Sequence, residues 1–267
     1  MASVIGLIAG GGKLPLVVAQ EVRGRGYQIV AVALEGEASK DLERYVDKIH
    51  WVRLGQLGQL IQALKGDGVS QAIMIGKVPM THIFSNIKPD LRGALFYMRL
   101  KDRRGDTILD GLAQELQGEG INLLDSTFFI SPLLVEKGVM TKRSPDPREW
   151  EDVAFGWKVA KALASLSIGQ TVVVKDLVVL AVEAIEGTDA TIRRGGELGR
   201  EGVVVVKVSR PDHDMRFDVP VVGLETVDSL KEVRARVLAL EAGRTLLMDR
   251  EEVVQKADRS GIAIVAQ

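Results

Sequence analysis

Acidic and basic side chains are concentrated in two stretches of the chain, residues 182–194 and 206–226. The candidates for chemistry among them are the carboxylates Glu183, Glu186, Asp189, Asp212, Asp214 and Asp218 and the cations Lys207, Arg210 and Arg216. Carboxylates at strand ends suit a hard divalent cation such as Mg²⁺, and interleaved Arg and Lys suit a diphosphate. A single acid of this kind usually belongs to a polar turn, whereas the whole set predicts metal-assisted phosphoryl chemistry.

A second candidate is the glycine-rich turn IAGGGKLP at residues 8–15. Between a strand and a helix, Gly10, Gly11, Gly12 and Lys13 would bring backbone amides and a helix N-terminus to a phosphate. The turn matches neither GxGxxG nor GxxxxGKS/T, so a tight turn without a ligand is the competing interpretation. Glu35, about 20 residues further on, is a candidate for a ribose hydroxyl.

A third candidate is the tripeptide Gly76, Lys77 and Val78, which follows a later apolar run. In open α/β sheets, ligands bind beyond the carboxyl ends of the strands. Lys77 could meet a phosphate there, and an ordinary surface lysine is the competing interpretation. We therefore include all three residues among the predicted substrate contacts.

The composition of the 267-residue chain excludes several classes of protein. Lys plus Arg (35) nearly equals Asp plus Glu (36), which gives a formal net charge of −1 and disfavours a nonspecific nucleic-acid binder. The absence of Cys excludes disulfides, cysteine nucleophiles and thiolate zinc sites, and three His disfavour a histidine-rich metal site. The apolar runs are shorter than the roughly 20 residues that span a bilayer, and no signal peptide is recognisable. We therefore predict a cytoplasmic protein.

The elements that position these residues alternate between strands and helices in the first half of the chain. Apolar runs predict strands over 3–9, 29–34, 47–52, 69–75 and 121–124, and helical spacing predicts helices over 14–23, 57–64, 86–101 and 106–116. Asp106 is the expected N-cap of the last of these helices. Residues 1–130 are therefore predicted to form a Rossmann-like α/β domain with a mostly parallel sheet.

A segment with three prolines, SPLLVEKGVMTKRSPDP at residues 131–147, is the predicted linker. Residues 148–267 are predicted to form a second, smaller α/β domain that carries the catalytic residues. Its expected helices are 150–165, a short one over 188–194, 226–238 and 251–259, and its expected strands are 171–175, 177–184, 202–208, 245–248 and 262–265.

Four strings in the chain resemble those of a known family: IAGGGKLP, GKV, LVVLAVEAIEGTDATIRR and RPDHDMRFDVPVVGLET. The family is the LpxI-type UDP-2,3-diacylglucosamine pyrophosphatases of lipid A biosynthesis, and the resemblance covers essentially the whole chain. It implies a Rossmann-like N-terminal domain, a distinct C-terminal domain and a Mg²⁺ cofactor. The implied reaction is hydrolysis of the diphosphate of UDP-2,3-diacylglucosamine to UMP and 2,3-diacylglucosamine 1-phosphate (lipid X).

The resemblance also implies roles for single residues. The family's essential aspartate lies in its RxDxP string and corresponds to Asp218, which would bind Mg²⁺ or orient the attacking water. Arg216 and Lys207 are the further catalytic candidates, because they can stabilise charge on the diphosphate. Asp189 and Glu186 join Asp218 as candidate metal ligands. The predicted substrate contacts are Gly10, Gly11, Gly12, Lys13, Gly76, Lys77, Val78, Glu183, Gly187, Thr188, Asp189 and Arg194.

A diacylated substrate would need an apolar channel and contact with a membrane. Candidates for the channel are Phe128, Phe129, Ile130, Leu133, Leu134 and Trp157, with an ordinary core as the competing interpretation. We expect transient association with the cytoplasmic face of the inner membrane, and a homodimer, the commonest assembly of small enzymes. The alternative functions are an NAD(P)-dependent oxidoreductase, suggested by the glycine-rich turn, and a non-catalytic nucleotide-sugar or lipid-binding protein.

Overall fold

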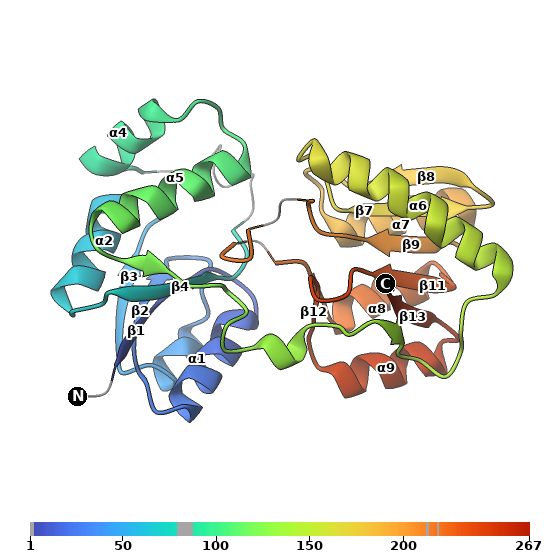
Figure 1. Cartoon of the computed structure of the whole chain (residues 1–267), viewed down its shortest axis with the longest axis horizontal. Coiled ribbons are helices and arrows are strands. Elements are labelled where there is room, and N and C mark those ends of the chain that lie inside the picture. The colour runs from blue at the N-terminus through green and yellow to red at the C-terminus, as the bar shows by residue number, and fades with distance from the viewer. Residues whose placement is uncertain (1–2, 79–87, 212–213, 218) are drawn as a thin grey trace. The chain divides into compact units, whose positions relative to one another are not determined.

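The computed structural model describes residues 3–78, 88–211, 214–217 and 219–267. The chain forms two compact units, shown in Figure 1. Unit 1 comprises Met1–Ser131 and Asp214–Asp218, and unit 2 comprises Pro132–His213 and Val219–Gln267. A short segment from the C-terminal half of the chain therefore belongs to unit 1.

Unit 1 is built on a five-stranded sheet in the order β3-β2-β1-β4-β5, in which each neighbouring pair is parallel. Its strands are β1 (Val4–Ala9), β2 (Gln28–Leu34), β3 (Lys48–Val52), β4 (Gln71–Ile75) and β5 (Asn122–Leu123). Its helices are α1 (Leu14–Gly24), the 3₁₀ helix η1 (Lys40–Arg44), α2 (Leu57–Gly66), α4 (Leu91–Arg99) and α5 (Gly105–Gly118). The predicted Rossmann-like parallel sheet is confirmed.

The sequences of β1 and β2 explain why this sheet is buried. Both are nearly continuous apolar runs, VIGLIA and QIVAVAL, which is the pattern of parallel strands covered on both faces. The strand order reverses between β1 and β4, and Ala9 pairs with Ile75 at the carboxyl ends of these two strands. Open α/β sheets bind ligands outside such a switch point, so residues 10–13 and 76–78 begin where a ligand is expected.

Unit 2 is built on a six-stranded mixed sheet in the order β6-β13-β11-β9-β7-β8. Its strands are β6 (Gly138–Val139), β7 (Thr171–Lys175), β8 (Val178–Val182), β9 (Val204–Lys207), β11 (Val237–Leu240) and β13 (Ala263–Ala266). A two-stranded parallel sheet is formed by β10 (Val221–Val222) and β12 (Leu246–Leu247). The predicted second α/β domain is confirmed.

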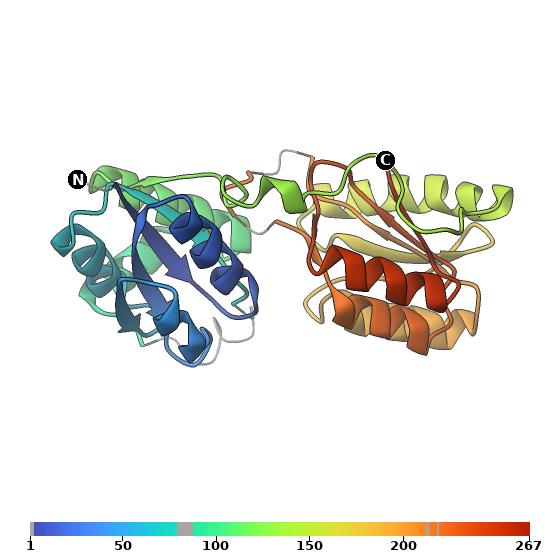
Figure 2. The same ribbon diagram turned by 90° about the horizontal axis from the view of Figure 1, so that it is seen from below.

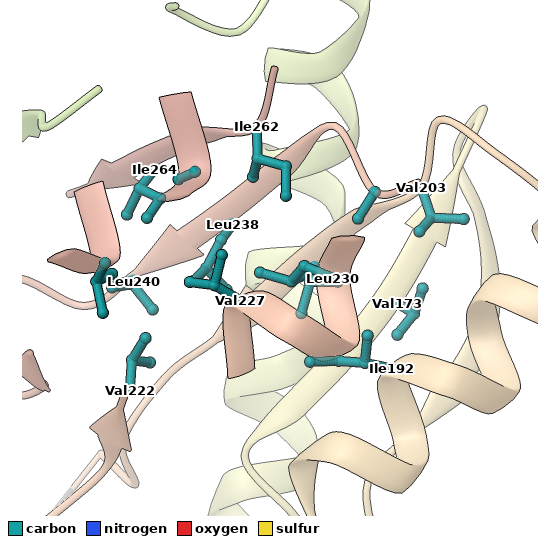
Figure 3. Close-up of a cluster of buried hydrophobic side chains, with 14 of the residues drawn as sticks. Val173, Ile192, Val203, Val222, Val227, Leu230, Leu238, Leu240, Ile262 and Ile264 are labelled. Atoms are coloured by element: carbon teal, nitrogen blue, oxygen red, sulfur yellow. The ribbon is translucent and has the colours of Figure 1, made fainter. Parts of the chain in front are cut away.

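Helices cover both faces of the larger sheet of unit 2. One face is covered by α6 (Pro147–Ser165), and the other by α7 (Thr188–Gly199), α8 (Leu224–Glu232) and α9 (Arg250–Arg259), as Figure 2 shows. The core under α7, α8 and α9 contains Val173, Ile192, Leu230 and Leu238, each fully buried (Figure 3). Apolar side chains from the sheet and from the helices meet in this core, which holds α7 against the sheet.

The structure corrects three expectations about the elements. The predicted helix over 226–238 ends at Glu232, and Val237–Leu240 forms β11 in the middle of the sheet. Arg234, with φ of 50°, breaks the helix where the apolar spacing in the sequence continues. The predicted linker contains β6, which pairs with β13, and the 3₁₀ helix η2 (Ser131–Leu133). The N-cap of α5 is Arg104, not Asp106, which lies in the first turn.

None of the helices in the described part of the chain is both long enough and apolar enough to cross a membrane.

Candidate functional site

The two loops at the switch point of unit 1 are hydrogen-bonded to each other. The Gly10 N–H donates to the Ile75 carbonyl at 2.9 Å, and the Gly11 N–H donates to the Lys77 carbonyl at 2.8 Å. The Lys77 N–H donates back to the Gly11 carbonyl at 2.9 Å. A Cβ on Gly10 would lie 2.8 Å from the Lys77 carbonyl oxygen, and one on Gly76 would lie 2.7 Å from the Gly10 carbonyl carbon. Glycine is therefore needed at both positions so that the two backbones can touch.

This packing changes the interpretation of the glycine-rich turn. The amides of Gly10 and Gly11 are used between the two loops, so they do not form the expected phosphate cradle. The open part of the turn begins at Gly12, which has φ of 88° and space around its Cα. Lys13 is the N-cap of α1, whose first turn contains no acidic residue. An anion could still be held by this helix N-terminus and by the exposed Lys77 beside the half-buried Val78.

The segment 214–217 lies at this same edge of unit 1, anchored by a serine that the sequence did not single out. Ser126, which follows β5 and is 2% exposed, donates its N–H to the Met215 carbonyl at 2.9 Å. Its Oγ is 2.6 Å from the Arg216 carbonyl and 2.9 Å from the Met74 carbonyl on β4. Residues about 90 positions downstream are therefore tied to the carboxyl edge of the sheet.

Arg216 is held in place by its neighbours in this segment. Its Nη2 and Nε donate to Asp214 at 2.6 and 2.9 Å, and its guanidinium lies 5.0 Å from the centre of the Phe217 ring. These hydrogen bonds to Asp214 raise the pKa of Arg216, and the charge of Asp110 on α5 adds to the effect. About 38% of the Arg216 side chain is exposed. Arg216 is thus a preoriented cation that a phosphate can reach.

Asp218, the aspartate predicted to be essential, lies outside the described residues, as do Asp212 and His213. Its neighbour in sequence, Phe217, is 5% exposed and belongs to unit 1.

Unit 2 places four predicted residues together at one edge of its larger sheet. Lys207 at the end of β9 is 7% exposed, and its Nζ donates to Thr188 Oγ1 at 2.7 Å. Thr188 Oγ1 donates in turn to Glu183 Oε1 at 2.9 Å, and Glu183 Oε2 accepts the Gln170 N–H at 3.1 Å. Thr188 begins α7, with Gly187 as the N-cap at φ of 85°. A buried ammonium beside a helix N-terminus favours an oxyanion, so this edge can bind a phosphate.

Glu186, Asp189 and Arg194 lie on or next to the same helix but bind protein partners. Glu186 Oε1 accepts from Arg194 Nη2 at 2.6 Å, and Asp189 Oδ1 accepts from Ser229 Oγ at 3.3 Å. The pKa of Glu186 is lowered, first by its own backbone N–H and then by Arg194, while burial opposes the change. Within the described ranges, no group of three or more His, Asp or Glu side chains is placed to hold a metal ion. In the structure, Glu186 and Asp189 are thus hydrogen-bonded to Arg194 and Ser229.

A second polar network at the edge of unit 2 was not predicted. Glu241, which follows β11, accepts from Lys161 Nζ at 2.7 Å through both of its oxygens. Glu241 Oε2 also accepts the Ser209 N–H at 2.7 Å, just beyond β9. Because the predicted helix 226–238 covered the start of β11, no strand end was expected at Glu241. The network joins α6 to the loops after β9 and β11 and stabilises the edge on which Lys207 lies.

Some other candidates have structural partners. Glu35 accepts from Arg53 Nε at 2.9 Å. Phe129 and Ile130 are each 1% exposed, so they are core residues and not the lining of an open channel. Trp157 packs against the core under α6, and Phe128 is 54% exposed.

Comparisons with known proteins cover both units. The family description "LpxI N-terminal domain" matches residues 4–133, and "LpxI C-terminal domain" matches residues 136–265. The chain is 32% identical over 272 residues to the UDP-2,3-diacylglucosamine pyrophosphatase LpxI of Caulobacter vibrioides, spanning 98% of this chain and 96% of that protein. A shorter match is to the bifunctional purine biosynthesis protein PurH of Anaeromyxobacter sp. (strain K). The identity there is 32% over 138 residues, which cover 48% of this chain and 22% of that protein.

Proposed function

The chain belongs to the LpxI family, and we propose on this premise that it hydrolyses the diphosphate of UDP-2,3-diacylglucosamine to UMP and 2,3-diacylglucosamine 1-phosphate. The observation that carries the proposal is the 32% identity, over nearly the whole length of both chains, to a protein of that name. The preoriented Arg216 in unit 1 and the buried Lys207 in unit 2 support it, since each is a cation suited to a phosphate.

The roles of these cations follow from the charge of the substrate. Two adjacent phosphates repel a nucleophile, so hydrolysis depends on neutralising their charge and holding a water in line. We assign charge neutralisation to Arg216 and Lys207. Arg216 fits this role because its guanidinium is fixed by Asp214, and Lys207 because its buried Nζ is held by Thr188 at the N-terminus of α7. Gly12, Lys13 and Lys77 are proposed substrate contacts of unit 1, and Gly187 and Thr188 of unit 2.

Asp218 is proposed as the essential carboxylate, and Mg²⁺ as the cofactor, on the basis of the family resemblance. Mg²⁺ commonly binds one or two carboxylates together with substrate phosphates, so a preformed cluster of three protein acids is not required. The described carboxylates provide no such cluster, and Glu186 and Asp189 are engaged by Arg194 and Ser229. When bound, Mg²⁺ would polarise the diphosphate as a Lewis acid.

The test is release of UMP from UDP-2,3-diacylglucosamine dispersed in detergent, with Mg²⁺ and with EDTA. Asp218→Ala should lower kcat by at least about 10²-fold, as expected for loss of a group that acts on the reacting water. The matched control is Asp41→Asn, which changes an aspartate of unit 1 that is 58% exposed on η1. Equal rates for Asp218→Ala and the control would refute the role of Asp218. Full activity in EDTA would refute the role of Mg²⁺, and no UMP from the wild type would refute the proposed reaction.

Three further expectations stay predictions: a homodimer, a cytoplasmic location and an acyl channel that includes Leu133 and Leu134. Both leucines are half-buried in the structure.

A further inference from the structure

Helix α4 of unit 1 carries a row of exposed apolar side chains. Leu91, Leu95 and Met98 are 79%, 44% and 81% exposed. At positions i, i+4 and i+7 they lie on one face of the helix. Figure 1 shows α4 beside α5, farther from the strands of the sheet than α5 is. We call these three residues the α4 stripe.

The opposite face of α4 is fixed to unit 1, so the stripe is not the result of a loosely placed helix. Arg92 donates to Glu115 on α5 at 2.8 Å and to Glu119, the C-cap residue of α5, at 2.7 Å. Gly93 lies so close to the Gly55 carbonyl oxygen that a Cβ on it would be 2.0 Å away. Phe96 packs against the apolar core of the unit. One face of α4 is thus packed against and hydrogen-bonded to the rest of unit 1, and the other face is apolar and exposed.

The segment that carries the stripe is rich in cations, of which Arg92 and Arg99 pair with Glu115. Residues 88–104 contain six Lys and Arg against two Asp. Lys88, Arg99, Lys101, Arg103 and Arg104 are all exposed. Arg103 lies over the Tyr97 ring at 4.9 Å from its centre, and Arg104 pairs with Asp102. Exposed apolar side chains flanked by cations are typical of a helix that lies in the surface of an anionic bilayer.

We propose that the α4 stripe and its flanking cations dock unit 1 on the surface of a bilayer that contains anionic lipid. Leu91, Leu95 and Met98 enter the boundary between headgroups and acyl chains, while the cations stay at the level of the lipid phosphates. This docking would bring the enzyme to its substrate, because a diacylated substrate resides in a bilayer. In this respect the proposal rests on the proposed function. It names the face that meets that bilayer.

A second copy of the chain fits this face less well than a lipid surface does. A twofold dimer sets the same patch of both copies against each other. The cations of segment 88–104 would then face an identical set, which costs free energy through like-charge repulsion. Anionic headgroups neutralise them instead, with a gain of about 1 kcal/mol per Lys or Arg near the surface, or roughly a fivefold gain in binding.

The experiment is co-sedimentation of the full chain with vesicles of phosphatidylcholine alone, or with about 30% phosphatidylglycerol. We expect the wild type to sediment with the anionic vesicles and to be released by about 0.5 M NaCl. The double variant Leu91→Ser and Met98→Ser should bind about tenfold less. The variant Lys101→Glu and Arg103→Glu should lose the preference for anionic vesicles. The control is Leu166→Ser and Leu198→Ser in unit 2, where the leucines are 66% and 64% exposed.

Each outcome decides the proposal. A wild type that stays in the supernatant, or a control that loses as much binding as the stripe variant, overturns it. A dimeric wild type that becomes monomeric by light scattering on Leu91→Ser and Met98→Ser would assign the face to a second copy. Vesicle binding is measured without turnover, and UMP release is measured separately in detergent. If the wild type releases no UMP, the proposed function fails and the vesicle-binding result still stands. If the wild type does not bind vesicles, the docking proposal fails and the result for UMP release still stands.

Discussion

At the scale of single residues, the hydrogen-bond partners of a charged side chain determine whether it can bind a phosphate. Lys207 and Arg216 are both cations near a sheet edge, but Arg216 has a carboxylate partner while Lys207 Nζ donates to a hydroxyl. Burying an ammonium is costly unless it is paired, and a bound phosphate would place an anion beside Lys207. The sequence indicated the residue types but not which hydrogen bonds each would make. The partners could not be predicted because they come from different elements.

Thr188→Val tests the contact between Thr188 and Lys207. The change removes the oxygen that accepts from Lys207 and leaves a buried ammonium with one partner fewer, so the free energy of unfolding should fall by about 1–3 kcal/mol. If Lys207 binds the diphosphate, kcat/KM should fall as well. Urea unfolding and UMP release measure the two effects. Thr188→Ser keeps the hydroxyl and should be close to the wild type; a Ser variant as impaired as the Val variant would contradict the role of the hydroxyl.

Asp67 provides a prediction of pH dependence. Its carboxylate binds Lys48 and, at 2.6 Å, His50 Nε2, and these hydrogen bonds, that from Lys48 first, lower its pKa. A lowered folded-state pKa stabilises the protein above the unfolded-state pKa of about 3.9, and this contribution is lost as pH falls through the folded-state value. Asp67→Asn should therefore lower the free energy of unfolding by about 1–2 kcal/mol at neutral pH. Urea unfolding at pH 7 and at about pH 3 should show the difference shrinking in acid; an equal difference at both pH values would contradict the assignment.

At the scale of elements, the predictions succeed where one pattern is unambiguous. The first strand, helix and second strand of unit 1 were predicted almost at their observed bounds, because apolar runs are separated there by glycines. The end of α8 was missed because apolar residues continue through Val237–Leu240 at spacings that suit either a helix or a strand. Glu241 was missed for the same reason.

Gly76→Ala tests whether the glycines at the switch point serve packing. The new Cβ would lie 2.7 Å from the Gly10 carbonyl carbon, at φ of 108°, so the two loops would have to separate. We expect the free energy of unfolding to fall by about 1–3 kcal/mol. Gly66→Ala at the end of α2 is the control, since nothing lies within 4 Å of its added Cβ. Equal unfolding midpoints in urea for the two variants would refute the packing role.

At the scale of the whole molecule, the two units are not two consecutive stretches of the chain, because a short segment of unit 1 is inserted in the sequence of unit 2. Unit 1 is completed by residues 214–218, after the chain has already formed most of unit 2. The sequence predicts these residues to lie in the second domain, because a long-range return of a few residues leaves no periodicity or change in composition. The string RPDHDMRFDVPVVGLET, which resembles the family, therefore runs through residues of both units.

Ser126→Ala tests this connection. The change removes the hydroxyl that lies 2.6 Å from the Arg216 carbonyl and 2.9 Å from the Met74 carbonyl, while the Ser126 N–H can still bind Met215. Loss of one hydrogen bond from a buried site should cost about 1–3 kcal/mol, and local opening should carry much of that cost. Amide exchange in a peptide spanning 214–217 should therefore become at least about fivefold faster, with exchange in the strands of unit 2 unchanged. Ser165→Ala, which removes an exposed hydroxyl of α6, is the control. Unchanged exchange of 214–217 in Ser126→Ala would show that Ser126 does not anchor the segment, and with it the residue before Asp218.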